Sequence, residues 1–539
     1  MASNILGIAT SALQVTQQAL DTTSHNIANV NTKGYSRQRV DAIAREPVFV
    51  GVGFLGTGVK TEAIKRSYDQ FLEAQLRAST SSFAEIDHYL RLTGQIDNIV
   101  ADPNVGISKA LANFFNAVHD AASDPTSIPA RQTLLSEVQT LADRFNGLDA
   151  RLKEINRQVF NDLENTAQDI NAIAKQIAEL NRRIVAKFGS VPNDLLDQRD
   201  QLITQLAEKI RVTQVAQGNG AVSLFIGNGQ ALVQDVQANA LYVQPNTLNP
   251  ERPEIILATA VGKLAITSKL QGGELGGMLR FLDEALEPTR LKLGRIAAGL
   301  ALEFNGLHRL GFDLDGNTGQ DFFVPLAIPV SQTGSGTITV DYASASDLEA
   351  SDYLLEYDGS NYTLTRLSDR VKTPIPSFPA VIDGLQIDVT TAPTGPSSFL
   401  IRPTAEAAAS LALAVDDPRQ IALAQNDTTT GTIGDNGIAL ELAALESKKT
   451  MLGGKATFQD AYGQMVAEVG TLTRAARIAQ AAQDTLKQQA VQAREAVSGV
   501  NLDEEAANLV RFQQAYQAAA HVVTVAQQTF DTLINAIRR

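Results

Sequence analysis

Cysteine and tryptophan are absent from this chain of 539 residues. Without cysteine, disulfide bonds, thiolate metal sites and a cysteine nucleophile are all excluded. Basic residues are outnumbered by acidic ones, 45 against 59, which leaves a formal net charge of −14. A nucleic-acid-binding protein needs a basic patch or stripe, so this balance argues against nucleic acid as a partner.

Long hydrophobic runs are missing as well. No stretch approaches the roughly 18 consecutive apolar residues that a membrane span requires. The first thirty residues lack the basic start and the compact apolar run of a cleaved secretory signal. We therefore expect no membrane partner, and we expect any export of the chain to use a route without signal cleavage.

Recognisable catalytic motifs are not found. The five histidines form no HExxH pair, and neither a GxSxG elbow nor a P-loop is present. Residues 51–56 match the letters GxGxxG but lack a preceding βαβ context, so they predict a glycine-rich loop or hairpin. Residues 313–319 resemble half a calcium loop, yet Thr318 and Val324 stand where an EF-hand needs Gly and Glu. This favours a turn between a helix and residues 322–323, and we expect no catalytic residue, no cofactor and no metal site.

The chain does contain a heptad pattern at each end. Leu6 begins a series of apolar residues seven positions apart, and Ala9 begins a second series of smaller residues. A similar double series runs through the last forty residues. Such a pattern is typical of coiled-coil helices, so the two ends are predicted to pair as an antiparallel hairpin. The positions predicted to pack between helices and between subunits are Leu6, Leu13, Leu20, Ile27, Leu509, Phe512, Tyr516, Val523, Phe530 and Leu533.

These terminal segments carry almost no charge. Asp21 is the only formally charged side chain in residues 1–32, and no Asp, Glu, Lys or Arg lies between Arg511 and Asp531. A solvated helix normally carries charge on its outer face, so these helices are expected to pack against protein on several sides. Periodicity alone leaves two interpretations open: a helical hairpin in the core of a monomer, or helices that contact other subunits.

The middle of the chain predicts a helical bundle. Residues 131–187 repeat apolar side chains at steps of three and four, which predicts a rod of roughly 85 Å. The pattern contains two consecutive steps of four around residues 159–163, a stutter that locally unwinds a supercoil. Further helices are predicted over residues 68–100, 108–122, 194–209, 277–310 and 458–497.

Two β-rich segments interrupt the helices, at residues 212–267 and 326–403. Short apolar runs separated by Gly, Asn and Pro predict strands and turns, and Asp-Gly at 358–359 predicts a hairpin. The predicted fold class is α+β and multi-domain, with paired N- and C-terminal coiled-coil helices, a long helical bundle and inserted β-rich outer domains. The predicted division is a terminal domain (1–60 with 500–539), a helical bundle (61–211 with 268–325 and 404–499), a small β-rich insert (212–267) and an outer β domain (326–403).

Four segments carry a resemblance to a known family. Residues 24–37 (SHNIANVNTKGYSR) resemble the N-terminal signature of the bacterial flagellar axial proteins, which form rod, hook and hook-associated structures. Residues 498–509 (SGVNLDEEAANL) resemble the matching C-terminal signature. Residues 193–202 (NDLLDQRDQL) and 272–277 (GGELGG) are similar to the hook-associated members that join hook to filament. The resemblance covers nearly the whole chain and is least diagnostic over 326–403.

This resemblance implies a structural subunit of the bacterial flagellum, outside the cell, at the junction between hook and filament. It implies a homo-oligomeric ring as well as contacts with the hook protein and with a second junction protein that leads to the filament. It also implies type III export without cleavage, with an export chaperone at the C-terminal helices. Because short paired helices without neighbours bury little surface, we expect the ends to be disordered in the monomer and to become helical on assembly.

Two alternatives remain at this point. The chain could be another axial component, such as a hook or distal-rod protein. From a different class, it could be a surface adhesin or hydrolase carried on the outer β domain, which would require a pocket with convergent polar groups.

Overall fold

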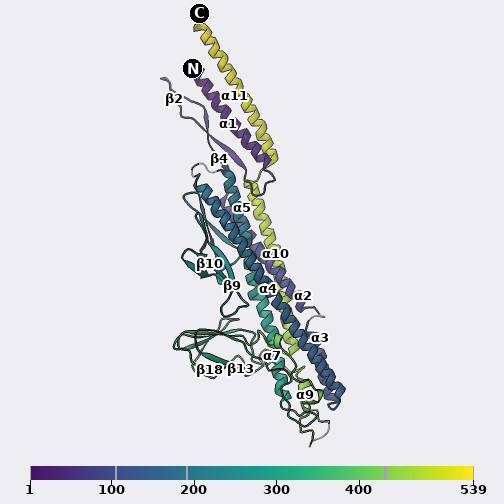
Figure 1. The fold of residues 1–539 in the computed structure, drawn as a ribbon. Helices are drawn as coiled ribbons and strands as arrows, with labels where there is room; N and C mark the ends of the chain where they lie inside the picture. The colour runs from purple at the N-terminus through teal and green to yellow at the C-terminus, as the bar shows by residue number, and fades with distance from the viewer. Residues whose placement is uncertain are drawn as a thin grey trace.

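The computed structural model describes residues 2–51, 53–102, 106–187, 189, 192–429 and 434–537. The molecule is elongated, and both chain ends lie at the same tip (Figure 1). At that tip, helices α1 (Ala2–Ala28) and α11 (Leu502–Ile537) lie side by side and run in opposite directions. The predicted α+β fold is confirmed, because paired terminal helices, a long helical bundle and separate β-sheet regions are all present.

Helix α4 (Ile128–Val185) is the spine of the bundle and contains 58 residues. The Ser127 hydroxyl accepts a hydrogen bond from the Ala130 amide, and Pro129 occupies the first turn, where its missing N–H is not needed. At about 1.5 Å per residue the helix is about 87 Å long. Its apolar stripe is buried over most of its length, including Val159 and Leu163 at the stutter, and Ile173 is partly buried.

Four further helices begin and end close to their predicted bounds. They are α2 (Gln70–Val100), α3 (Ser108–Ser123), α5 (Asn193–Lys209) and α10 (Phe458–Ser498). The short helices α8 (Ala407–Ser410) and α9 (Gly437–Ala444) and the 3-10 turns η1 (Thr267–Lys269) and η3 (Pro418–Gln420) were not evident from periodicity. Segments this short span about two turns or fewer, so they show little of the 3.6-residue repeat.

The helix predicted over 277–310 begins earlier and is interrupted. The structure divides it into α6 (Gly273–Phe281), a π-helical turn η2 (Leu282–Leu286) and α7 (Glu287–His308). A π turn inserts a residue into the helical repeat without ending the helix. The apolar pattern therefore continues across it, and the interruption is visible only in the backbone.

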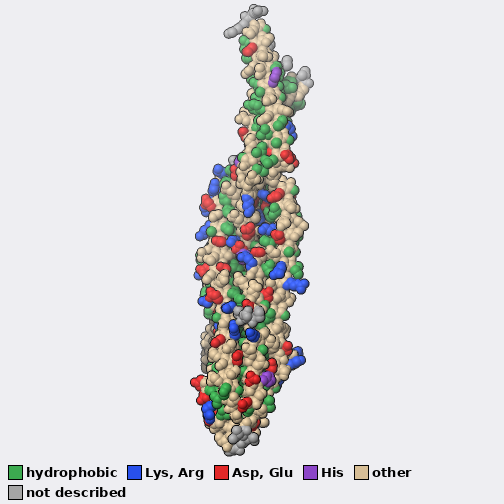
Figure 2. Space-filling view, turned by 90° about the vertical axis from the view of Figure 1, so that its right-hand side faces the viewer, with side chains coloured by type: hydrophobic (Ala, Val, Ile, Leu, Met, Phe, Trp, Pro, Cys, Tyr) green, Lys and Arg blue, Asp and Glu red, His purple; other side chains and the backbone are tan. Residues whose placement is uncertain are grey.

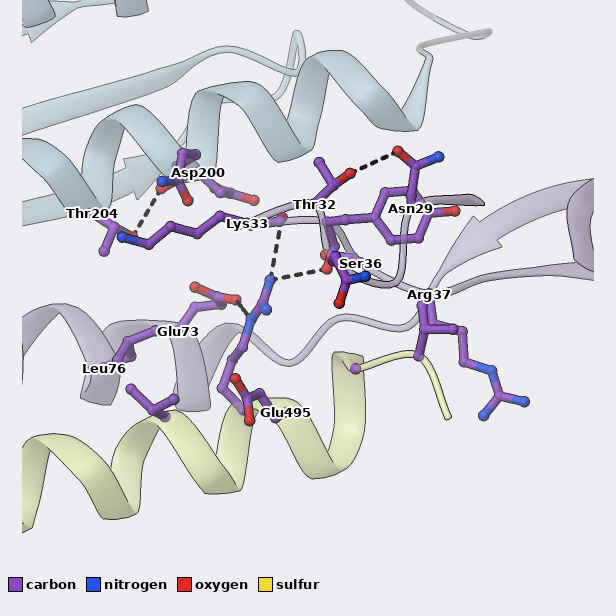
Figure 3. A pocket seen from close by; sticks show the side chains of 18 of the residues that line it. Asn29, Thr32, Lys33, Ser36, Arg37, Glu73, Leu76, Asp200, Thr204 and Glu495 are labelled. Atoms are coloured by element: carbon purple, nitrogen blue, oxygen red, sulfur yellow. Dashed lines mark hydrogen bonds and ion pairs between the residues drawn. The ribbon is translucent and has the colours of Figure 1, made fainter. Parts of the chain in front are cut away.

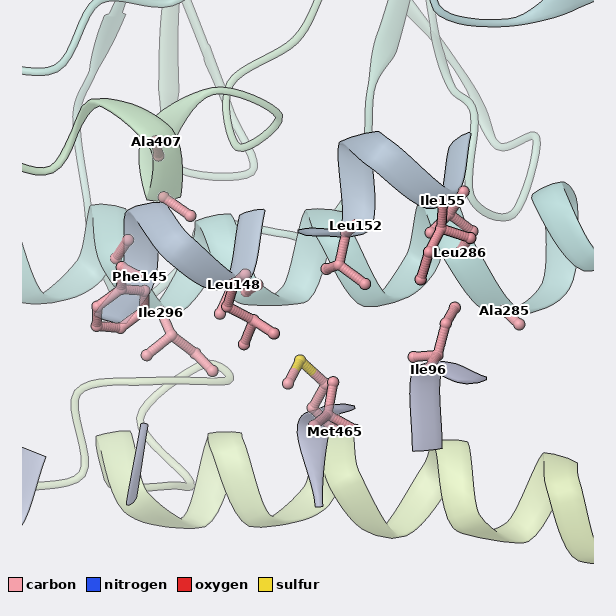
Figure 4. Close-up of a cluster of buried hydrophobic side chains, with 14 of the residues drawn as sticks. Ile96, Phe145, Leu148, Leu152, Ile155, Ala285, Leu286, Ile296, Ala407 and Met465 are labelled. Atoms are coloured by element: carbon pink, nitrogen blue, oxygen red, sulfur yellow. The ribbon is translucent and has the colours of Figure 1, made fainter. Parts of the chain in front are cut away.

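The bundle core lies where α4 crosses α2, α7 and α10 (Figure 4). Leu148 and Leu152 of α4 point toward Ile296 of α7, Met465 of α10 and Ile96 of α2. All five side chains are at most 2% exposed. Complete burial of a large aliphatic side chain contributes about 1.5–3 kcal/mol, so this layer supplies much of the stability of the bundle.

Glu274, in the GGELGG segment, connects three helices through charge. Its carboxylate lies 3.5 Å from His88 Nε2 of α2 and 2.8 Å from Lys209 Nζ of α5. Burial acts to raise the pKa of Glu274, but the hydrogen bonds and charges of His88 and Lys209 outweigh it and lower the pKa to about 2. The start of α6 is therefore held to its neighbours by an ionised carboxylate.

This geometry predicts an acid sensitivity that depends on Glu274. Because the folded pKa lies below the ordinary value of 4.5, the stabilisation is complete above that pH and is lost as pH falls toward about 2. We expect Glu274→Gln to reduce the fall in urea midpoint between about pH 5 and about pH 3. Glu164→Gln, at an exposed position of α4, serves as control and keeps the full decrease. Equal acid slopes in wild type and Glu274→Gln would contradict the assignment.

A small β region follows α5. One antiparallel sheet has the order β5-β6-β7-β8, and a second has the order β11-β10-β9. Both sheets pack near α4, since β7, β8 and β9 contact that helix. The strands are β5 (Val212–Ala216), β6 (Val222–Ile226), β7 (Gln230–Gln234), β8 (Gln237–Ala238), β9 (Ala240–Pro245), β10 (Pro253–Thr259) and β11 (Gly262–Ala265).

The outer β domain contains a five-stranded sheet, β12-β19-β14-β15-β16, and a three-stranded sheet, β13-β18-β17. The predicted hairpin is present, with Tyr357 opposite Tyr362. Both β regions lie on the same side of the bundle in Figure 1. The strands are β12 (Val330–Thr333), β13 (Thr337–Tyr342), β14 (Tyr353–Tyr357), β15 (Tyr362–Arg366), β16 (Lys372–Ile375), β17 (Ala380–Ile382), β18 (Leu385–Thr391) and β19 (Ser397–Ile401).

A long β-hairpin accompanies α1. Strands β1 (Gln38–Ala44) and β4 (Val59–Arg66) pair antiparallel, and β2 (Val48–Phe49) and β3 (Phe54–Leu55) extend beyond them. The glycine-rich segment 51–56 thus lies at a hairpin, which is one of the two forms predicted for it. The heptad pattern does not predict the β1–β4 ladder. The domain division stays a prediction, and its boundary after residue 60 falls inside β4.

The calcium-like segment forms a turn after α7, as predicted. Asp313 Oδ1 accepts hydrogen bonds from the backbone amides of Asp315 and Asn317, both at 2.8 Å, and Phe322 and Phe323 beyond it are fully buried. Among the residues that the structure describes, no group of three or more acidic or histidine side chains is arranged to hold a metal ion. None of the described helices is long and apolar enough to cross a membrane.

Candidate assembly interface

We call α1, α11 and strands β1–β4 the stalk. The two stalk helices pack through small side chains: Ala9 and Ala526 are 3% and 5% exposed, and Thr23 is 4% exposed. All three belong to the second, smaller heptad series. The distance between packed helices depends on the side chains at the contact, so small residues here allow the two helices to approach closely.

The larger predicted positions lie at the edge of this contact or outside it. Leu6, Tyr516 and Phe530 are exposed, at 38%, 39% and 53%. The side chain of Leu533 lies outside the described residues. The partly buried positions are Leu13, Leu20, Ile27, Leu509, Phe512 and Val523. The assignment of the whole set to contacts between subunits stays a prediction.

An apolar surface remains uncovered on the stalk. In Figure 2 the narrow stalk shows few charged side chains, whereas Lys, Arg, Asp and Glu are frequent on the body. We call its exposed apolar side chains the stalk stripe. Exposed apolar side chains that gather on one part of a molecule, here on α1 and α11, mark protein contact sites. The stalk stripe consists of Ile5, Leu6, Ile8, Val510, Tyr516, Val522, Val525, Phe530 and Ile534.

A polar clasp joins the stalk to the body, and Asn26 lies at its centre. The Asn26 side-chain oxygen accepts hydrogen bonds from the Tyr35 hydroxyl at 2.7 Å and from the Gln38 amide at 2.9 Å. Its Nδ2 donates to the Gln38 carbonyl and to Glu505 Oε2 of α11. Asn26 is 1% exposed, so a single buried amide joins α1, the following loop, β1 and α11.

Arg37 connects the two chain ends directly. Its Nε donates to Glu505 Oε1 at 2.8 Å and its Nη1 to Glu504 Oε2 at 2.6 Å. Its backbone amide donates to the carbonyl of Ser498 at the end of α10.

The Tyr35 hydroxyl stays protonated. Burial raises its pKa, and the nearby carboxylates of Asp194, Asp197 and Glu505 raise the pKa further, so Tyr35 remains a donor to Asn26.

Two carboxylates of α5, Asp197 and Asp200, connect the clasp to that helix. Asp197 accepts a hydrogen bond from the Ser36 amide at 3.0 Å and pairs with Arg66 of β4 at 2.8 Å. Arg66 also lies 2.7 Å from Asp200. Burial acts to lower the pKa of Arg66, but the two aspartates outweigh it and raise the pKa, which keeps the guanidinium charged.

On its other side the clasp borders a cavity of about 1340 Å³. Arg494 of α10 donates to Glu73 of α2 at 3.0 Å and to the Gly34 carbonyl at 3.3 Å across this space (Figure 3). Gly34 has φ of +84°, a left-handed conformation that favours glycine. Arg494 and Glu73 are paired with each other, and this ion pair holds α10 to α2.

Sequence reasoning missed the clasp as a site. Residues 24–37, 193–202 and 498–509 were each singled out as motifs, but nothing in the linear sequence says that they meet. The available signal was their polarity: Asn26 and Glu505 interrupt heptad helices at positions that the structure buries. A buried polar residue on a coiled-coil face commonly serves to fix a partner or register.

Known protein families match most of the chain, including the segments that form the clasp. Residues 6–35 match the flagella basal body rod protein family, and residues 491–536 match the flagellar basal body rod FlgEFG protein C-terminal family. Residues 93–323 match the flagellar hook-associated protein FlgK helical domain, and residues 330–403 match the D2-like domain of flagellar hook-associated protein 1.

Flagellar hook-associated protein 1 of Salmonella typhimurium is 34% identical over 553 aligned residues, which cover 99% of this chain and 100% of the relative. The chain belongs to the flagellar hook-associated protein 1 family. The Escherichia coli K12 member is 32% identical with the same coverage, and the Bacillus subtilis member is 25% identical over 100% of this chain and 99% of its own.

A solved structure shares the fold of this chain. The flagellar hook junction protein FlgK from Burkholderia pseudomallei superposes with a TM-score of 0.73 at 25% identity. The match covers 79% of this chain and 100% of that one.

The clasp predicts a strong effect of Asp197→Ala. The change leaves the Ser36 amide without its acceptor and removes one of the two carboxylates that pair with the partly buried Arg66, which costs about 1–3 kcal/mol. We expect faster hydrogen exchange at residues 36–38 and 64–67 and a lower thermal midpoint. Asp162→Ala, at an exposed position of α4, is the control and leaves both measurements unchanged. Wild-type exchange rates in Asp197→Ala would show that the clasp does not hold these strands.

Proposed function

We propose that this chain is a structural subunit of the junction between the hook and the filament of the bacterial flagellum. The observation that carries the proposal is the relationship to hook-associated protein 1 along essentially the whole length of both chains. The solved relative in this family is described as a hook junction protein. The exposed stalk stripe supplies a physical reason for assembly, because burial between subunits removes it from water.

In this proposal the stalk packs against the stalks of neighbouring copies to form a ring. A helix surface without charge can be enclosed by protein at little desolvation cost, whereas buried unpaired charges are costly. Because the stalk presents different surfaces around its axis, contacts between copies are head-to-tail and close into a ring or continue as a helix. The β regions then extend from one side of the bundle.

The partners follow from this arrangement. One end of the ring contacts the hook protein, and the other contacts a second junction protein that leads to the filament. An export chaperone covers the C-terminal helices before assembly, and α11 offers a long exposed apolar surface for it. We also propose that the flagellar type III apparatus exports the chain and that the assembled subunit lies outside the cell.

The alternatives have less support. A hook or distal-rod protein accounts for the matches at residues 6–35 and 491–536, but not for those at 93–323 and 330–403. An adhesin or hydrolase on the outer β domain would need a site of its own, and the relatives described above carry the names of hook-associated proteins. Imaging flagella of cells that lack this protein tests the choice: we expect hooks without filaments and flagellin shed to the medium, whereas normal filaments would overturn the proposal.

The stalk stripe predicts the effect of Val525→Asp. Val525 is 47% exposed, so the monomer tolerates aspartate, but a charge enclosed between subunits without a partner is strongly unfavourable. We expect a folded body, with filament attachment reduced at least tenfold in electron micrographs of cells in which the variant chain is detected outside the cell. Val261→Asp, at a turn position that is 99% exposed, is the matched control and leaves filament number unchanged. Full filament number in Val525→Asp would remove Val525 from the assembly surface.

A further prediction concerns the isolated monomer. Paired helices that join through few buried side chains gain too little to stay ordered without neighbours. We expect residues 1–30 and 510–539 to exchange amide hydrogens rapidly in the monomer and slowly in assembled flagella, while α4 is protected in both. Full protection of these ends in the monomer would contradict this prediction.

A further inference from the structure

A cluster of charges lies at the root of the outer β domain. Asp352 comes directly before β14 and Arg402 directly after β19, and these two strands are paired, so both side chains lie at the same end of the sheet. Arg402 Nε donates to Asp352 Oδ2 at 3.2 Å. Both residues are buried, at 6% and 7% exposed.

The cluster joins three parts of the chain. Arg402 Nη2 lies 3.0 Å from Glu251 Oε2, in the loop between β9 and β10, and 3.5 Å from Glu287 Oε1 at the start of α7. The buried Arg290 of α7 lies 3.1 Å from the same Glu251 oxygen and 3.6 Å from Glu287. We call these residues the root network, and it fastens the outer β domain to the small β region and to the bundle. The root network consists of Asp352, Arg402, Glu251, Glu287 and Arg290.

Carboxylates outnumber guanidinium groups in the root network. Asp352, Glu251 and Glu287 face only Arg402 and Arg290, so one negative charge is not compensated when every group is ionised. A buried charge without compensation is costly, and a carboxyl group near other carboxylates favours its neutral form.

The charged groups around the root network do not supply the missing cation. Lys153 is shared by Asp149 and Glu406, which adds a further carboxylate. Arg370 is exposed, so water screens its charge. The other neighbouring arginines have acidic partners of their own, and these pairs are Arg252 with Asp283, Arg280 with Glu284, and Arg295 with Glu349.

Asp352 is the least stabilised carboxylate of the root network. Glu251 accepts hydrogen bonds from two arginines, whereas Asp352 Oδ1 is buried and has no donor among the residues that the structure describes. Burial and the charge of Glu287 raise the pKa of Asp352 to about 7, although Arg402 opposes the rise. With Asp352 protonated, the two remaining carboxylates balance the two guanidinium groups.

A cavity brings solvent to this residue. Asp352 lines a space of about 820 Å³ between the small β region, η2 and the outer β domain. Charged side chains such as Glu254 and Asp283 also line it, and a polar space of this size holds water. Protons can therefore reach Asp352 while the rest of the root network stays packed.

We propose that the root network is a proton-controlled latch, which holds the outer β domain more firmly on the bundle when Asp352 has taken up a proton. Loss of the proton leaves an uncompensated carboxylate in the closed joint. Opening of the joint relieves this cost, because water then surrounds Asp352. The latch belongs to the single chain and does not rest on the proposed function.

The latch tightens as pH falls. The pKa of Asp352 in the closed joint lies above its ordinary value of 3.8, so the closed joint keeps the proton over a pH range in which the open joint has lost it. Closure is therefore most favourable below about pH 4 and weakens progressively as pH rises to about 7.

Two backbone amides report on the joint. The Leu367 amide donates to the Asp352 carbonyl at 2.9 Å, and the Arg402 amide donates to the Pro329 carbonyl at 3.0 Å. Opening at the root exposes both amides to exchange with solvent. Their protection factors, which are corrected for the intrinsic effect of pH on amide exchange, therefore measure how firmly the latch is closed.

Hydrogen exchange of the full-length chain at about pH 5.5 and about pH 8 tests the latch. We expect protection at residues 367 and 402 to be at least fivefold higher at the lower pH. Asp352→Asn, a neutral side chain of nearly the same shape, is expected to keep the high protection at both pH values. Asp341→Asn, at an exposed position of β13, is the control and keeps the wild-type difference. Equal wild-type protection at the two pH values, an unchanged difference in Asp352→Asn, or low protection of a folded Asp352→Asn at both would each overturn the inference.

Glu287→Gln gives a second test that leaves Asp352 in place, and it decides the matter if Asp352→Asn does not fold. Removal of the negative charge beside Asp352 makes the ionised form less costly and lowers its pKa. We expect the difference in protection between the two pH values to shrink at least twofold. Glu356→Gln, at an exposed position of β14, is the matched control. A full wild-type difference in Glu287→Gln would contradict the latch.

Discussion

The structure depends on the meeting of its two chain ends. Arg37 and Asn26 from the first forty residues contact Glu505 near the start of the last helix, so a polar clasp joins segments more than 460 residues apart. Everything between them is an insertion that leaves the stalk and returns to it. The long helices of the bundle and both β regions therefore share one point of attachment to the stalk.

The clasp and the bundle core are stabilised by different forces. The core is a layer of aliphatic side chains along α4, where burial from water is the main term. The clasp is made of ion pairs and amide hydrogen bonds, and on one side it borders a cavity of about 1340 Å³. Buried ion pairs contribute little net stability but penalise wrong partners, so the clasp is better suited to fixing the register of the stalk on the body than to holding it by strength alone.

The stalk leaves apolar surface available for assembly. Its two helices bury small residues against each other and leave larger apolar residues outside, in contrast to a coiled coil that is complete by itself. The buried small residues align the two helices, and the exposed larger residues leave apolar surface that neighbouring subunits can cover.

Much of this was determined by the sequence alone. The period of Leu134, Val138 and Leu141 specified α4, the uncharged heptads specified paired ends, and the Asp-Gly turn specified the β14–β15 hairpin, because each is a local pattern with a local cause. Tertiary structure decided the rest. The π turn after Phe281, the β1–β4 ladder and the burial of Ala9 in place of Leu6 all depend on which surface meets which neighbour. The clasp of Asn26, Asp197 and Glu505 is the clearest example of a feature decided by tertiary structure. Its hydrogen bonds join three segments that are distant in the sequence, so no local sequence pattern predicts them.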